Sequence, residues 1–140
     1  MNRFFAGVGL VGSLMLMTPC EAATMRFECA EPVAAPAQAP DPSGSWDMVM
    51  DVGGTPSFGL LSVARAGVDL AGSIALNAGV VVVRSLKISA DRTVAMIVAS
   101  GEGDVRFDGE LAPDGKRMCG IVSYHGGQKL EMVAQKRPAR

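Results

Sequence analysis

Apolar and polar positions alternate along most of the chain from residue 44 onward. Residues 104–111 alternate charged side chains with Val105, Phe107 and Leu111, and residues 45–52 show the same pattern. An alternation with a period of two is typical of strands that bury one face. The pattern predicts eight strands, at 45–52, 57–65, 68–76, 79–88, 93–99, 104–111, 117–123 and 129–135.

Turn-forming residues separate these segments, for example Gly53-Gly54 and Pro113-Asp114-Gly115. A new strand about every 10–12 residues, with short loops, is typical of an all-β sandwich or barrel, and short loops favour antiparallel neighbours. A closed barrel leaves no edge strand to aggregate. We therefore expect an all-β, eight-stranded antiparallel up-and-down barrel over residues 44–137, with an open sandwich as the alternative.

The same alternation assigns an inward face to most strands. An eight-stranded barrel is filled by side chains or holds one small ligand, and inward glycines such as Gly109 and Gly120 fit either tight curvature or a cavity. In segment 79–88 four consecutive valines leave the faces undecided, and one face could be covered by the tail or by another chain. The inward residues that we expect to meet a ligand are Trp46, Met48, Met50, Met96, Phe107, Met118 and Met132.

The N-terminal part has a different character. Residues 1–22 combine Arg3, an apolar stretch and small residues around Ala22, which predicts a secretory signal peptide. Residues 23–43 follow as a flexible linker rich in proline and alanine, which cannot form a helix or a sheet ladder. Pro19 stands where a lipoprotein signal needs a small residue, so we expect no lipid anchor on Cys20.

Composition and charge further restrict the class of protein and its compartment. The chain has 13 basic and 14 acidic residues, without the basic excess of a nucleic-acid-binding protein. No apolar run reaches the roughly 18 residues of a membrane-spanning helix. We expect a periplasmic or secreted protein, in an oxidising compartment where Cys29 and Cys119 could form a disulfide. The alternative is a free thiol in the tail and a small apolar strand residue.

The first strand opens with Gly44-Ser45-Trp46, and this G-x-W resembles the start of lipocalin-like (calycin) barrels. The pattern from Val105 to Gly120 is similar to that of small bacterial exported domains of the same type. The resemblance implies structural roles for Gly44 and Trp46, and a basic residue from the last strand packed over the Trp. Lys136 and Arg137 match that position, and we expect Arg137. Lipocalins carry a helix after the barrel, which this sequence lacks, so classical lipid binding is not implied.

Residues that carry chemistry are few. His125 could act as a general base, but the sequence places no serine, cysteine or carboxylate beside it, and we expect a solvent-exposed turn residue. The acidic group at Glu102, Asp104 and Asp108 lacks the pattern of a calcium loop. The inward methionines could suit Cu(I), but core packing explains them better. We therefore expect no catalytic residue, no metal and no cofactor.

Two functions remain in balance. One is a binding module that holds a small apolar ligand in the barrel. The alternative is a protein-interaction module, such as a periplasmic protease inhibitor or an accessory domain of an exported hydrolase. A weaker hypothesis is that the protein is an enzyme. A polar partner for His125 inside a pocket would strengthen it. The expected partner is thus a small apolar molecule or another exported protein.

Overall fold

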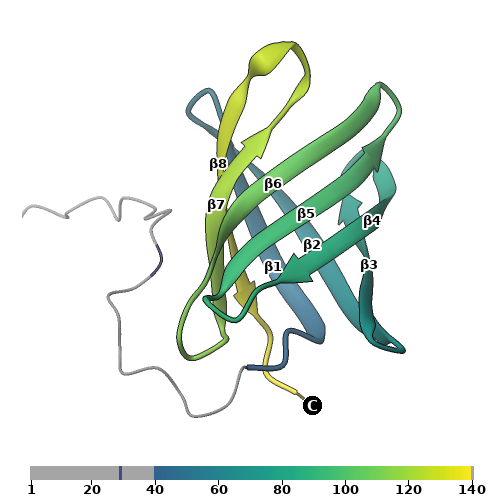
Figure 1. The fold of residues 1–140 in the computed structure, drawn as a ribbon. Coiled ribbons are helices and arrows are strands. Elements are labelled where there is room, and N and C mark those ends of the chain that lie inside the picture. Colours follow the sequence, from purple (N-terminus) through teal and green to yellow (C-terminus); the bar gives the residue numbers. More distant parts are fainter. Residues whose placement is uncertain (1–28, 30–39, 140) are drawn as a thin grey trace, which may run out of the picture.

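The computed structural model describes residue 29 and residues 40–139, and it contains the eight strands of the sequence pattern (Figure 1). Each lies within two residues of its expected bounds. The expected signal peptide and most of the linker, with Cys20, lie outside the described residues. The strands are β1 (Gly44–Val52), β2 (Thr55–Ala66), β3 (Asp69–Leu76), β4 (Gly79–Ile88), β5 (Thr93–Ser100), β6 (Gly103–Leu111), β7 (Arg117–Ser123) and β8 (Lys129–Lys136).

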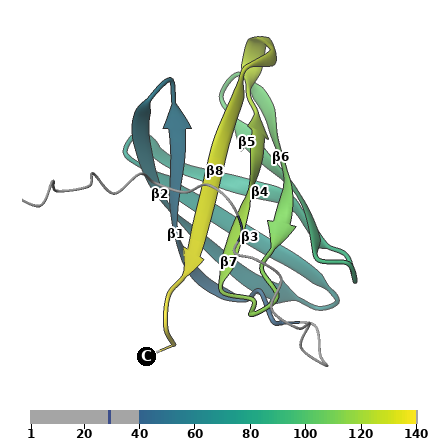
Figure 2. The ribbon, with the colours of Figure 1, turned by 90° about the vertical axis from the view of Figure 1, so that its left-hand side faces the viewer.

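The strands form a closed antiparallel barrel in chain order, so the expected fold class is confirmed and the open sandwich is wrong. Pairing of β1 with β8, from Trp46 opposite Lys136 to Met50 opposite Met132, closes the barrel. Figure 2 looks onto β8, which lies between β1 and β7. A short 3-10 turn, η1 (His125–Gly127), joins β7 to β8. Within the described residues, no helix has the length and apolar character to cross a membrane.

The core follows the period-two alternation closely. Side chains at alternate positions of each strand point inward and are buried, whereas the charged positions between them face outward. Each apolar side chain removed from water contributes roughly 1.5–3 kcal/mol, so this inner set supplies most of the favourable free energy of folding. The largest fully buried side chains are Trp46, Phe107, Leu61, Met96, Leu111, Met118, Met132 and Val94.

Strand β4, whose faces the sequence left open, changes phase along its length. Val83 points inward and is buried, but the pairing shifts register between Val83 and Ser85, and Leu86 is the next buried residue. An extra residue in one strand moves the following side chains to the other face. The outward Val80 and Val82 are 70% and 58% exposed.

Gly109 and Gly120 allow close packing inside the barrel rather than leaving space. They lie opposite each other in β6 and β7. A Cβ atom on Gly109 would collide with the backbone carbonyl of Cys119, and the Cζ atom of Phe107 lies 2.5 Å from the position of that Cβ. The Phe107 ring therefore occupies the space that a side chain at Gly109 would need.

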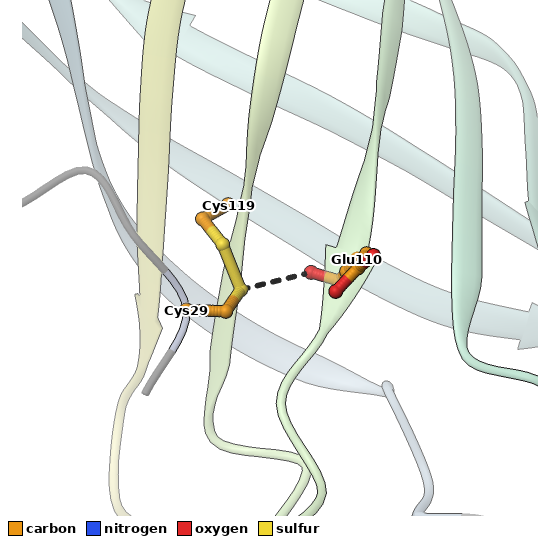
Figure 3. Close-up of a disulfide and its surroundings, with 3 residues drawn as sticks. All are labelled: Cys29, Glu110 and Cys119. Atoms are coloured by element: carbon orange, nitrogen blue, oxygen red, sulfur yellow. Dashed lines mark hydrogen bonds between the residues drawn. A yellow bond between two sulfur atoms is a disulfide. The ribbon is translucent and has the colours of Figure 1, made fainter. Parts of the chain in front are cut away.

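A disulfide joins the N-terminal segment to the outside of the barrel (Figure 3). Cys119 points outward from β7, as the alternation predicts, and its Cα atom is 5.6 Å from that of Cys29. The Cys29 sulfur also lies 3.4 Å from the carbonyl oxygen of Glu110, a close contact without a donated hydrogen because both cysteines are oxidised. This bridge confirms the expected disulfide over the free-thiol alternative.

Candidate functional site

The barrel contains a cavity of about 410 Å³ toward one end. Residues from the β3–β4 and β7–β8 connections border it, together with the end of β1, the start of β2 and Ser100 at the end of β5. Because consecutive strands run up and down, these connections lie together at what we call the open end, uppermost in Figure 1. Val52 and Tyr124 line the cavity while remaining 40% and 42% exposed, so they mark its mouth. The volume falls within the usual range for small-molecule sites, roughly 300–1,000 Å³.

The deeper cavity wall is apolar and rich in methionine. Met48, Met96, Phe107 and Met132 line it and are at most 3% exposed. Methionine has a flexible, polarizable side chain that adapts to differently shaped apolar partners. Of the eighteen residues that line the cavity, fourteen are apolar and none is charged.

Five of the seven residues expected to meet a ligand line this cavity, and two do not. Met48, Met50, Met96, Phe107 and Met132 are brought together there, whereas Trp46 and Met118 lie among the core residues outside its lining. Alternation along a strand reports which face a side chain occupies. It does not report the height of that side chain along the barrel axis, and a cavity at one end depends on that height.

Four uncharged polar side chains line the cavity: Ser57, Ser100, Tyr124 and Gln128. All come from strand ends or from the β7–β8 connection at the open end. Within the described part of the chain, the side chains of Ser57, Tyr124 and Gln128 have no hydrogen-bond partner, although the Tyr124 ring packs against His125 with centroids 4.6 Å apart. Sequence reasoning missed these polar residues because nothing in the alternation marks them.

Ser100 ties two connections at the open end together. Its hydroxyl lies 2.7 Å from the carbonyl oxygen of Gly103, accepts from the backbone N–H of Glu102 at 3.3 Å, and lies 2.8 Å from Nε2 of His125. A serine hydroxyl has a single proton, so the tautomer of His125 decides whether Nε2 donates to Ser100 or accepts from it. His125 is therefore partly buried and bonded, and not the free turn residue that the sequence suggested.

The opposite end of the barrel, which we call the closed end, is built around Trp46. Its ring is fully buried, and its indole N–H donates to the carbonyl of Pro42 at 3.0 Å. The ammonium group of Lys136 lies 5.7 Å from the ring centroid and donates to the carbonyl of Asp41 at 2.5 Å. The segment before β1 thus crosses this end and covers it.

The basic residue over the Trp46 ring is Lys136 and not Arg137. Arg137 instead forms a salt bridge with Asp47 on the outer face. Its Nε and Nη2 atoms lie 2.9 and 2.5 Å from Oδ1 of Asp47. The hydrogen bonds from Arg137 hold the pKa of the Asp47 carboxyl below its ordinary value of 3.8. Hydrogen bonds from Ser43 similarly lower the pKa of Asp41, at the same end.

The described residues contain no group of three histidine, cysteine or acidic side chains that could hold a metal ion. The acidic positions Asp104 and Asp108 pair with Arg84 and Arg106 on the outer surface. Within the part of the chain that the structure describes, the arrangement best suited to recognition is an apolar cavity with a neutral polar mouth. Comparison with models of protein families and with curated proteins finds no match for this chain.

Proposed function

We propose that this chain is an exported, calycin-like barrel that binds a small apolar ligand in the cavity at its open end. The observation that carries the proposal is the cavity itself, which is large enough for a small molecule and lined by fourteen apolar and four neutral polar residues. Export is supported by the Cys29–Cys119 disulfide, because such bonds persist in oxidising compartments. The G-x-W start, with Lys136 over the Trp46 ring, supports the calycin resemblance.

The cavity favours binding over catalysis. A nucleophilic serine is activated by a base that a third group orients, but within the described residues Ser100 is the one hydrogen-bond partner of the His125 ring. We assign Ser100 and His125 to holding the cavity mouth. The binding free energy would come from apolar surface removed from water, at roughly 25 cal/mol per Å² before the costs of association.

A matched pair of valine variants tests the proposal. Val105→Phe places a larger side chain in the cavity, whereas Val82→Phe adds the same side chain to the outer surface. The probe is N-phenylnaphthylamine, a neutral dye that fluoresces in apolar sites. We expect dye binding in the native protein, at least about tenfold weaker binding in Val105→Phe, and unchanged binding in Val82→Phe. Absence of dye binding in the native protein, or equal binding in both variants, would contradict a cavity site.

Native mass spectrometry of the chain purified from its own exported fraction gives an independent test. We expect a non-covalent small molecule that is released on denaturation. A second protein bound in its place would favour the protein-interaction alternative. The denatured mass also reports cleavage near Ala22 and the loss of two hydrogens at the Cys29–Cys119 bridge.

A further inference from the structure

The four polar side chains at the cavity mouth are uncharged, and three of them have no hydrogen-bond partner within the described residues, which restricts the chemistry of the ligand. We propose that the cavity selects neutral amphiphiles, molecules with an apolar body and a single uncharged polar end such as a hydroxyl or amide. This inference rests on the proposed function and specifies its ligand class. The residues that would recognise the polar end are Ser57, Tyr124 and Gln128.

The lining gives the ligand one orientation. Along β1, Met48 lies at the buried level and Val52 at the exposed mouth. Four residues of a tilted strand cover roughly 10 Å along the barrel axis, the length of a medium acyl or alkyl chain. The deep wall offers methionine, phenylalanine and aliphatic side chains, so the apolar body faces inward and the polar end stays at the mouth.

The three polar residues flank the same strand end. Ser57 lies on β2, opposite Met50 of β1, and β8 pairs with β1 on its other side. Tyr124 and Gln128 belong to the connection that leads into β8, and a backbone hydrogen bond of 2.8 Å from Tyr124 N–H to the Gln128 carbonyl holds them together. Hydroxyl and amide groups both donate and accept, so they pair well with a hydroxyl or amide on the ligand.

A charged end group on the ligand would meet no opposite charge among the residues that line the cavity. Burying an ionised group without a partner costs far more than burying a hydrogen-bonded neutral group. Near the mouth, Arg84 is paired with Asp104 and the Lys129 ammonium donates to Ser123 on the outer surface. The backbone turn at the mouth also carries Glu102, whose charge opposes a carboxylate.

Displacement of N-phenylnaphthylamine from the full chain by four matched ligands tests the selection at pH 8. Decane has no polar end, decanol has a neutral one, and decanoate and decylamine carry opposite charges. We expect decanol to bind roughly two- to tenfold more tightly than decane, as one net hydrogen bond allows. Decanoate and decylamine should bind at least about tenfold more weakly than decanol.

Two variants locate the polar end. Gln128→Leu should reduce the advantage of decanol over decane, whereas Gln135→Leu, on the exposed outer face of β8, should leave it unchanged. Tyr124→Phe removes a second polar group, the phenolic hydroxyl, without removing the ring and should act in the same direction as Gln128→Leu. Dye binding itself verifies that each variant retains a folded cavity.

The outcomes separate this inference from the proposed function. If none of the four ligands displaces the dye, the proposed function fails. If decane and decanol bind equally, or decanoate binds as tightly as decanol, the cavity binds ligands but does not select neutral amphiphiles. A preference for decanoate that disappears in His125→Gln would assign recognition to a charged His125 and would overturn the inference in favour of anionic amphiphiles.

Discussion

The two ends of this barrel are built from the same eight alternating strands but finish differently. At the closed end Trp46 is fully buried, bonded to Pro42 and covered by Lys136. At the open end Val52 and Tyr124 remain 40% and 42% exposed around a cavity of about 410 Å³. Alternation alone therefore produces an apolar interior, and the size of the inward side chains and the crossing segment decide where that interior is filled.

This contrast suggests a division of labour between the ends. The closed end combines a large aromatic side chain with a covering chain segment, and it should supply stability. The open end leaves apolar side chains partly exposed and, within the described residues, the side chains of Ser57, Tyr124 and Gln128 without hydrogen-bond partners, which costs stability but keeps space for a ligand. The following substitutions test whether stability and binding separate in this way.

Trp46→Ala should have the largest effect on stability. Removing a fully buried aromatic side chain costs about 3–5 kcal/mol of unfolding free energy, and the variant also loses the hydrogen bond to Pro42. Val52→Ala at the open end should cost less than about 1 kcal/mol. Urea unfolding measures both costs. It is followed by circular dichroism and not by tryptophan fluorescence, because Trp46→Ala removes the single tryptophan. Similar costs for the two variants would contradict a division of labour.

Joint replacement of Cys29 and Cys119 by serine should have the next largest effect. The bridge spans 90 residues, and cross-links over long loops typically contribute about 2–4 kcal/mol by restricting the unfolded chain. The bridge lies outside the barrel, so binding of N-phenylnaphthylamine by the folded variant should not change. Weakened dye binding at temperatures well below unfolding would instead couple the outer bridge to the cavity.

His125→Ala should affect the open end locally. The variant loses the hydrogen bond to Ser100, which is worth about 0.5–1.5 kcal/mol, and should increase amide hydrogen exchange at residues 124–128. Ser123→Ala, which removes an outward contact with Lys129, serves as the control. Equal exchange in the two variants would show that the Ser100 contact does not hold this connection.

Asp47→Asn should have the smallest effect, visible in the acid range. The pKa of Asp47 is lowered in the folded protein by the Arg137 hydrogen bonds, so its contribution is present above 3.8 and is lost as pH falls through the folded pKa. The stability difference between native protein and Asp47→Asn should shrink as the pH falls below 3.8. Acid unfolding curves measure it, with Asp108→Asn at the Arg106 pair as a comparison. A difference that persists at lower pH would assign the effect to packing.

Most of the strand positions could be predicted from the sequence because burial on one face imposes a period of two. The same parity contained the signal that Lys136 covers Trp46, since Leu130, Met132, Ala134 and Lys136 occupy one face of β8. The faces of β4 could not be predicted, because its four consecutive valines show no alternation and the register shift after Val83 then reverses the parity. The position of the cavity along the barrel and its polar mouth escaped prediction, since they depend on heights along the axis and on contacts such as Ser100 with His125.

The position of the disulfide divides the chain into a covalent ring and a free arm. The ring formed by Cys29 and Cys119 contains β1 to β6 and the start of β7, whereas β8 follows it. Yet β8 pairs with both β1 and β7 and completes the barrel. The disulfide therefore restricts the conformations of the unfolded chain over the first strands and leaves the last strand unrestricted. Closure of the barrel by β8 rests on non-covalent strand pairing outside the covalent ring.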